Sequence, residues 1–229
     1  MVKTSVILVA GGSGSRMGAP LPKQFLTLRG ETILAITLRR FLRAFPDSEI
    51  VIALPDAERN RWNTIARQCG LSGTHKVCSG GPTRFDSVKN ALNTLSACDY
   101  IAIHDAVRPF VSRQLIDNCL NTALEYGNAV PAVIPVDSYR AVDPFGNNHI
   151  IDRNTLRIIQ TPQVFRSEML LDAYRTDFKP SFTDDASVVE AAGFNISLCP
   201  GDRLNIKITS PEDMALAESI FDFMSQNNL

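Results

Sequence analysis

Short apolar runs alternate with longer amphipathic stretches along the first half of the chain. The apolar runs, rich in β-branched residues, predict strands at 5–10, 49–55, 75–80 and 100–106. The stretches between them repeat apolar residues at helical spacing and predict helices at 32–45, 57–70 and 84–96. Strands this continuously apolar are usually covered on both faces. The pattern therefore predicts an α/β fold, a Rossmann-like and mostly parallel sheet with helices on both faces.

The alternation stops between residues 135 and 160. Two extended segments there flank a run of turn-forming residues at 143–148, which predicts a projecting β-hairpin arm at about 137–160. An isolated two-stranded hairpin is only marginally stable in water, so the apolar residues of the arm need a surface to pack against. These residues include Val142, Ile150 and Ile151. Either a second subunit or the arm's own domain could supply that surface, and spacing alone does not decide between them.

The last third of the chain returns to regular elements. Helices are predicted at 167–176 and 183–192, then a strand at 196–200, the segment 204–209 and a closing helix. Ser210 gives that last helix an N-cap, followed by proline at its first position and acids in its first turn. No repeat or linker interrupts the sequence. We therefore expect a single domain over 1–229, with the arm as its projection.

The composition indicates which binding partners and which cell compartment to expect. Of the 229 residues 45% are hydrophobic, and the net charge of -1 gives no general attraction to nucleic acid or to an anionic membrane. No apolar run approaches the ~20 residues of a membrane span, and the first strand begins too early to leave room for a secretion signal. The five cysteines form no Cys-x-x-Cys pair, and the three histidines are too dispersed for a zinc pattern. We expect a cytoplasmic protein without a nucleic-acid or membrane partner.

The first strand runs into a glycine-rich turn, LVAGGSGSRMGAPLPKQF, at residues 8–25. Glycines let backbone N–H groups approach a phosphate closely. A dinucleotide fingerprint would need glycine where Met17 stands, and the P-loop pattern of Gly-Lys-Ser/Thr is missing as well. Arg16 and Lys23 add two cations, so the turn favours binding of a triphosphate. The plainer alternative is a strand-to-helix turn with two solvated cations.

Six segments, taken in order, resemble a known family. They are AGGSGSRMG with LPKQF, GGPTRFDSV (80–88), HDAVRPF (104–110), DRN with QTPQVF (152–165), TDDASVVE (183–190) and NIKIT (205–209). From about residue 5 to residue 220 the chain resembles the 2-C-methyl-D-erythritol 4-phosphate cytidylyltransferases, with the hairpin where that family has its dimerisation arm. The resemblance implies a nucleotidyltransferase of non-mevalonate isoprenoid biosynthesis. Such an enzyme joins CTP and 2-C-methyl-D-erythritol 4-phosphate, with Mg²⁺, to give 4-diphosphocytidyl-2-C-methyl-D-erythritol and pyrophosphate.

The resemblance also implies roles for single residues. The catalytic residues would be Arg16, Lys23, Lys207 and Arg153, the first three of them at the triphosphate. The residues at CTP would be Ala10, Gly11, Gly12, Ser13, Gly14, Gly81, Ser87 and Asp105. The residues at the polyol phosphate would be Asp105, Asp137, Ser138, Arg153, Thr161 and Thr183, some of them reaching across from the arm of a partner in a homodimer. Asp105 would also hold the Mg²⁺. Position 138 carries serine where the family often has threonine, which keeps the hydroxyl and loses the methyl group.

Several of these residues have a plainer interpretation. Asp105 could be a turn or N-cap aspartate, and His104 beside it a structural neighbour. Lys207 could be an edge-strand lysine that discourages aggregation. Arg153 could form a solvated or interfacial ion pair with Asp152.

The chemistry of this reaction suits the residues that the sequence offers. The attacking phosphate monoester is already ionised at neutral pH, its second pKa being ~6, so no general base is required. The sequence has no recognisable Ser/His/Asp set. Three other functions remain open: a ribitol-5-phosphate cytidylyltransferase, an NAD(P)-dependent oxidoreductase, and a protein that binds CTP without turning it over.

Overall fold

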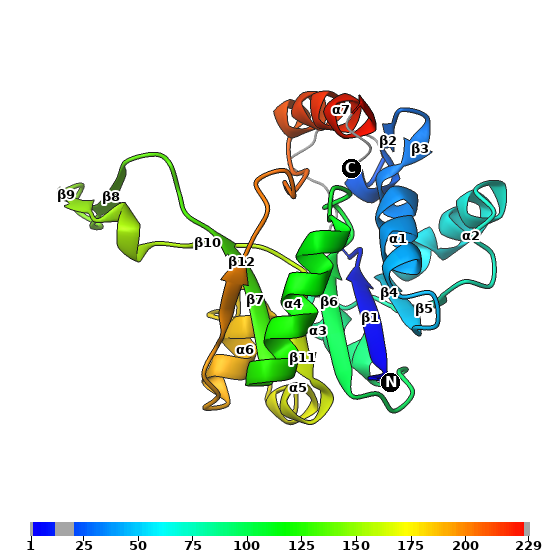
Figure 1. Cartoon of the computed structure of the whole chain (residues 1–229), viewed down its shortest axis with the longest axis horizontal. Coiled ribbons are helices and arrows are strands. Elements are labelled where there is room, and N and C mark those ends of the chain that lie inside the picture. The colour runs from blue at the N-terminus through cyan, green and yellow to red at the C-terminus, as the bar shows by residue number, and fades with distance from the viewer. Residues whose placement is uncertain (1, 12–20, 227–229) are drawn as a thin grey trace.

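The computed structural model of the chain describes residues 2–11 and 21–226, which form an eight-stranded main sheet. Its strands are β1 (Thr4–Val9), β4 (Ile50–Leu54), β5 (Lys76–Ser79), β6 (Tyr100–Asp105), β7 (Asn128–Val133), β10 (Ile158–Ile159), β11 (Gln163–Arg166) and β12 (Leu198–Pro200). The order across the sheet is β10-β7-β11-β6-β1-β4-β5, and β12 pairs with β7. β5, β4, β1 and β6 are parallel, whereas β11 runs antiparallel to both of its neighbours. The expected Rossmann-like, mostly parallel sheet is confirmed (Figure 1).

Helices cover both faces of this sheet, as the sequence predicts. They are α1 (Ile33–Ala44), α2 (Arg59–Gln68), α3 (Arg84–Leu92), α4 (Arg113–Tyr126), α5 (Ser167–Ala173), α6 (Asp185–Ala191) and α7 (Pro211–Gln226). Alternate residues of a strand point to opposite faces. Leu8 of β1 accordingly packs in the cluster with α1, α2 and α4, and Ile7 in the cluster with α3, α5 and α6. Among the described residues, no helix is both long enough and apolar enough to cross a bilayer.

The carboxyl ends of the parallel strands meet at one edge of the sheet. Val9, the last residue of β1, is in register with Asp105, the last residue of β6. On the other side of β1, Leu54 of β4 is in register with Ser79 of β5. In open α/β sheets ligands bind at this edge. The sheet therefore brings together Ala10 and Gly11, at the start of the glycine-rich turn, with Asp105 and the start of α3.

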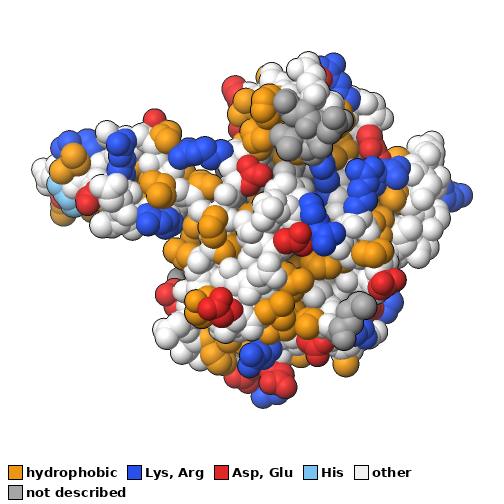
Figure 2. All heavy atoms as spheres, in the orientation of Figure 1, with side chains coloured by type: hydrophobic (Ala, Val, Ile, Leu, Met, Phe, Trp, Pro, Cys, Tyr) orange, Lys and Arg blue, Asp and Glu red, His pale blue; other side chains and the backbone are white. Residues whose placement is uncertain are grey.

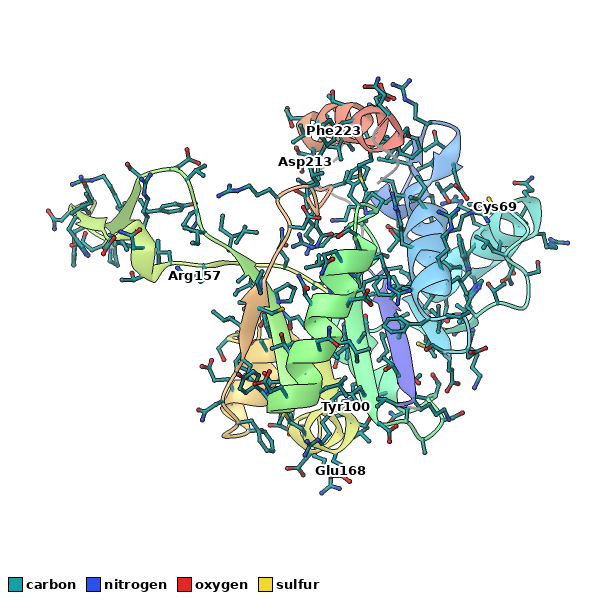
Figure 3. All side chains as sticks on the ribbon, in the orientation of Figure 1. Cys69, Tyr100, Arg157, Glu168, Asp213 and Phe223 are labelled. Carbon is teal, nitrogen blue, oxygen red and sulfur yellow. The ribbon has the colours of Figure 1, made fainter. Side chains whose placement is uncertain are left out.

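The end of the chain folds over the same edge. α7 packs in a third apolar cluster with Val107, Phe110 and Ile208. The helix starts as predicted, because the Ser210 hydroxyl accepts the backbone N–H of Asp213 at 3.3 Å as an N-cap, and the Asp213 carboxylate accepts the N–H of Ser210 in return (Asp213 is labelled in Figure 3). The segment 204–209 is not a strand in the described sheet, and a single backbone bond, from Ile208 N–H to the carbonyl of Val107 at 3.0 Å, ties it to the turn after β6. The edge-strand interpretation of Lys207 is therefore wrong.

The arm is a separate two-stranded sheet that extends away from the body (Figure 1). It pairs β8 (Tyr139–Val142) with β9 (Asn148–Ile151), and Asp143 closes its turn by accepting the N–H groups of Phe145 and Asn147. Val142 is 66% exposed and Ile150 72% exposed, so packing of the arm on its own domain is wrong for these side chains. A second short hairpin, β2 (Thr27–Leu28) with β3 (Glu31–Thr32), lies before α1.

Candidate active site

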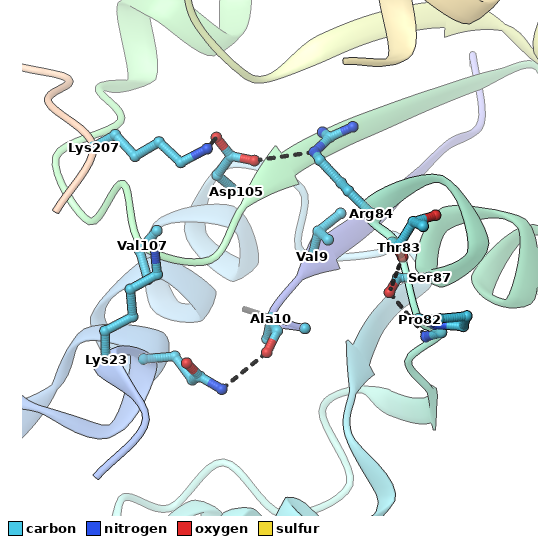
Figure 4. A pocket seen from close by; sticks show the side chains of 13 residues that line it. Val9, Ala10, Lys23, Pro82, Thr83, Arg84, Ser87, Asp105, Val107 and Lys207 are labelled. Carbon is cyan, nitrogen blue, oxygen red and sulfur yellow. Dashed lines mark hydrogen bonds and ion pairs between the residues drawn. The ribbon is translucent and has the colours of Figure 1, made fainter. Parts of the chain in front are cut away.

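A pocket of about 400 Å³ lies at the carboxyl edge of the sheet (Figure 4). It is walled by the ends of β1 and β6, the turn that leads into α3, the turn at Lys23 and the segment around Lys207. Its lining residues are Val9, Ala10, Gly11, Lys23, Gln24, Gly81, Pro82, Thr83, Arg84, Ser87, Asp105, Val107 and Lys207. Six residues predicted at CTP or its triphosphate thus share one pocket with Lys207. Gly12, Ser13, Gly14 and Arg16 lie outside the described residues.

Two glycines converge on Ser87 in this pocket. The N–H of Gly81 donates to the Ser87 hydroxyl at 3.0 Å, and that hydroxyl donates to the carbonyl of Thr83. A Cβ at Gly81 would lie 2.3 Å from the Cβ of Asp86, and one at Gly11 would lie 3.0 Å from the Ser87 hydroxyl. Both glycines therefore pack tightly against the start of α3, and at Gly81 a larger residue would force the turn or the helix to shift.

The turn that carries Lys23 is fixed to the end of β1. Gln24 is buried, and its side-chain amide donates to the carbonyl of Ala10 at 2.9 Å (Figure 4). Lys23 begins a short 3₁₀ helix, Lys23–Phe25, whose Phe25 packs into the main core. The structure therefore places Lys23 on the pocket wall beside the glycine-rich turn.

Asp105 is surrounded by three cations. Its carboxylate meets Lys207 Nζ at 3.0 Å, Arg108 Nε at 3.2 Å and Arg84 Nε at 3.4 Å. Burial by itself would raise the pKa of this carboxyl, but Arg84, then Lys207 and Arg108, hold the pKa well below its usual range. Asp105 is therefore ionised, and its carboxylate faces side-chain cations instead of capping a helix.

A chain of hydrogen bonds fixes the end of β6 behind Asp105. The Thr161 hydroxyl accepts the N–H of Asp105 at 3.1 Å and donates to Nδ1 of His104, while Nε2 of His104 donates to the carbonyl of Arg108. Burial lowers the pKa of His104 to about 4, so its ring is neutral at pH 7. His104 is thus the structural neighbour that the plainer interpretation describes. The Thr161 hydroxyl keeps one acceptor position for a ligand.

A second pocket, of about 250 Å³, adjoins the first at Asp105. Its lining residues are Arg84, Asp105, Arg108, Ile159, Gln160, Thr161, Gln163, Thr183, Asp184 and Lys207. Thr161 and Thr183 are therefore brought together as predicted for the acceptor site. Arg84, Asp105 and Lys207 line both pockets. Two ligands could lie on either side of this shared wall.

The predicted residues of the arm line neither of the two pockets. Asp137 and Ser138 are exposed at the base of the arm. The guanidinium of Arg153 donates to the carbonyl of Val136, within the arm itself. Within the described parts of one chain, the structure does not bring these three residues to Asp105.

Two residues that contact Asp105, Arg84 and Arg108, were not assigned to the site from the sequence. Both belong to segments that carry the family resemblance, TRFDSV and HDAVRPF, and both follow a strand that ends at the same sheet edge. The available signal was an arginine within five residues of such a strand end. The structure adds that each of them contacts Asp105.

Comparison with known proteins shows the family of the chain. The family model for 2-C-methyl-D-erythritol 4-phosphate cytidylyltransferase (IspD) matches residues 4–222. A protein of that name from Bacteroides thetaiotaomicron is 41% identical over 96% of this chain and 100% of its own length. Another from Porphyromonas gingivalis is 42% identical over 94% of this chain and 96% of its own length. These names support the methylerythritol substrate over ribitol 5-phosphate.

Solved structures show the same fold. The crystal structure of 4-diphosphocytidyl-2C-methyl-D-erythritol synthase from Anaerococcus prevotii has a TM-score of 0.83 at 26% identity and covers 96% of both chains. That of 2-C-methyl-D-erythritol 4-phosphate cytidylyltransferase from Thermus thermophilus has a TM-score of 0.76 at 32% identity, over 95% of this chain and 98% of its own. This chain is a nucleotidyltransferase that belongs to the 2-C-methyl-D-erythritol 4-phosphate cytidylyltransferase family.

Proposed function

We propose that the larger pocket binds CTP, that the smaller one binds 2-C-methyl-D-erythritol 4-phosphate, and that the bond forms at the wall between them. The observation that carries this proposal is the sharing of Arg84, Asp105 and Lys207 by both pockets. The products are 4-diphosphocytidyl-2-C-methyl-D-erythritol and pyrophosphate. The reaction belongs to non-mevalonate isoprenoid biosynthesis.

The residues of the chain act by alignment and by charge. Both substrates are anions, which repel each other until cations intervene. Lys207 lies on the shared wall, where its ammonium can meet the α-phosphate of CTP as the acceptor oxygen attacks. Lys23 and Arg16 hold the triphosphate and stabilise the charge that grows on the departing pyrophosphate. The acceptor phosphate is already ionised, so the residues need only orient it.

Asp105 suits a role in holding Mg²⁺. It is the one acid among the described residues that line the larger pocket, it is ionised, and a carboxylate has lone pairs beyond those that its three cations use. Mg²⁺ typically binds one or two carboxylates and the substrate phosphates, keeping several waters. Bound there, the ion would neutralise charge on the triphosphate. Lys207 and Arg108 keep the carboxylate ionised and fix its position.

The arm completes the acceptor site of a second copy in a homodimer. Its exposed apolar side chains need a partner surface, and its basic side chains lie beside them (Figure 2). Asp137, Ser138 and Arg153 then contact the substrate phosphate or hydroxyls in the partner's smaller pocket.

All five cysteines are free thiols, which is typical of a reducing compartment, so we place the enzyme in the cytoplasm.

A two-substrate assay tests this proposal. With Mg²⁺ and CTP, pyrophosphate release should be much faster with 2-C-methyl-D-erythritol 4-phosphate than with ribitol 5-phosphate. Equal or reversed rates would overturn the assignment of 2-C-methyl-D-erythritol 4-phosphate as the substrate.

Substitutions test the roles of the three cations. Lys23→Ala, Arg16→Ala and Lys207→Ala should each lower kcat by about 10²- to 10³-fold. Lys76→Ala, which removes an exposed lysine at the opposite end of β5, is the matched control and should leave kcat unchanged.

A further inference from the structure

An ion pair with a fully buried carboxylate holds Arg84, one of the residues that line both pockets. Asp185 is fully buried in the first turn of α6, and its carboxylate accepts hydrogen bonds from both terminal nitrogens of Arg84, at 2.8 and 2.7 Å. The hydroxyl of Tyr174 donates to the same carboxylate at 2.7 Å. Asp185 therefore binds both terminal nitrogens of Arg84, which we call its fork, in the bidentate geometry that arginine and carboxylate groups favour.

The third nitrogen of Arg84 is the one that meets Asp105. Nε donates to Oδ1 of Asp105 over 3.4 Å, whereas Lys207 and Arg108 both meet Oδ2. This contact is longer than either bond of Arg84 to Asp185. Asp185 is therefore the stronger partner of the guanidinium. If its charge were removed, the fork would be free to turn onto Asp105, the other carboxylate that it meets.

Aromatic rings cover this pair. Phe85, next to Arg84 in the chain, stacks on Tyr174 with ring centroids 4.8 Å apart and on Phe182 with centroids 5.7 Å apart. The carboxylate of Asp185 is fully buried beside these rings, and an ion pair that is screened less by water is held more strongly.

The backbone segment that carries Asp185 is also fixed to the sheet. Gln163 of β11 is fully buried. Its side-chain amide nitrogen donates to the Asp184 carboxylate at 2.8 Å, and its side-chain oxygen accepts the backbone N–H of Ala186 at 2.9 Å. The residues on both sides of Asp185 are thus bonded to the strand that lies beside β6. The carboxylate cannot follow Arg84 if the arginine moves.

We propose that Asp185 is a positioning residue for the transfer reaction, which holds the fork of Arg84 away from Asp105 so that the Asp105 carboxylate stays available between the two pockets. The inference rests on the proposed function, because that function assigns Asp105 to both substrates and to the metal. Asp185 itself lines neither pocket. It acts through Arg84.

Asp185→Asn tests this inference, because it keeps the size of the side chain and removes its charge. We expect kcat for pyrophosphate release to fall by about 10- to 100-fold, as for other small misplacements in an active site. The Kd for CTP, measured by calorimetry without acceptor, should change less than about threefold and the stoichiometry should stay the same, because CTP binding also uses the glycine-rich turn and Lys23. Asp185→Glu, which keeps the charge, should recover part of kcat.

The matched control is Asp117→Asn. Asp117 also accepts hydrogen bonds from an arginine, Arg113, but at the surface on α4, and this variant should keep wild-type kcat. An unchanged kcat in Asp185→Asn would overturn the inference. So would a fall in kcat that is matched by an equal fall in CTP stoichiometry, because lost folded protein would then explain it.

Two further measurements separate this inference from the proposed function. Tyr174→Phe keeps the stacked ring and removes one hydrogen bond to Asp185, so it should lower kcat by a few-fold in the same direction. A crystal structure of Asp185→Asn should show the fork of Arg84 on Asp105, and an unmoved Arg84 would overturn the inference. A wild-type chain that binds CTP but releases no pyrophosphate would instead contradict the proposed function. The position of Arg84 in the variant would still show whether Asp185 holds the arginine away from Asp105.

Discussion

Gly81 is the residue whose replacement most directly tests how closely the backbone approaches the start of α3. A Cβ there would lie 2.3 Å from the Cβ of Asp86 and 2.9 Å from its backbone carbon. Neither atom is the end of a flexible side chain, so the turn or the helix must shift. A position can be intolerant of a single methyl group even when its φ is ordinary.

Gly81→Ala should therefore destabilise the protein and weaken CTP binding. Overpacking of this kind costs about 1–3 kcal/mol in the free energy of unfolding. Gly80→Ala is the matched control, because a Cβ there meets its nearest atoms at 3.4 Å, an ordinary contact. Urea unfolding and the Kd for CTP would measure both effects. Equal behaviour of the two variants would contradict the steric argument.

A second residue-scale prediction concerns pH. The buried indole N–H of Trp62 donates to Nε2 of His75 at 2.8 Å, so this nitrogen must remain unprotonated. Burial lowers the pKa of His75 below its usual value, and a weaker hydrogen bond to the carbonyl of Leu71 opposes it. The unfolded chain then binds the proton more readily, so the free energy of unfolding should fall as the pH falls below about 6.5.

Urea unfolding between pH 7.5 and 5 would measure this dependence. His75→Gln keeps an acceptor for the indole and does not titrate, so its stability should fall less over that range. His149→Gln, which changes an exposed histidine of the arm, should keep the wild-type dependence. A wild-type slope in His75→Gln would show that other groups cause the loss.

At this scale the sequence predicted the site residues that stand beside a recognisable motif in the chain. Asp105 ends an apolar strand and Lys23 follows a glycine-rich turn, and both line the larger pocket. Arg84 gave only the weak signal of its place shortly after the end of β5, because an arginine in the first turn of a helix looks the same in the sequence whether it is solvated or part of a site. Its partner Asp185 is 101 positions away. Only the folded sheet brings the two together.

At the scale of elements, the arm is the part that the sequence predicted in most detail. Its turn residues and the break in the βαβ alternation marked it, and β8 and β9 fall within the predicted range. β11 was not predicted as a strand, because its four residues are too few to show a period and because buried Gln163 reads as polar. Gln163 is needed there to bond the start of α6, which only the tertiary structure shows.

The arm should control the oligomeric state. Ile150→Asp places a charge on an apolar surface that we expect to be buried between subunits, so it should shift the mass in sedimentation from dimer towards monomer. The melting temperature of the body should change little, because Ile150 is exposed within one chain. Leu171→Asp, at an exposed position of α5, should leave the mass unchanged. A dimer that survives Ile150→Asp would argue against this surface.

At the scale of the whole molecule, the proposed site is built from two chains. In this proposal the core of one subunit would supply Lys207 and Asp105, and the arm of the other would supply Arg153. This division leads to a complementation experiment. A Lys207→Ala chain and an Arg153→Ala chain are each expected to be nearly inactive, but in a mixed dimer one site combines an intact core with an intact arm.

Equal mixing of the two variants, after subunit exchange, should therefore recover about a quarter of the wild-type rate, because half of the dimers are mixed and each has one intact site. Pyrophosphate release before and after exchange measures the recovery. Two Lys207→Ala preparations mixed together provide the control. If Arg153 acts on its own chain, mixing will restore nothing.

The wall shared by the two pockets also bears on inhibition. A single molecule that carries cytidine at one end and a phosphorylated polyol at the other could occupy both pockets at once, with its second half held near its subsite by the first at high effective concentration. The reaction product has this architecture. Turnover should therefore slow as product accumulates, and a non-hydrolysable mimic of the diphosphate bridge would be a starting point for a tight ligand.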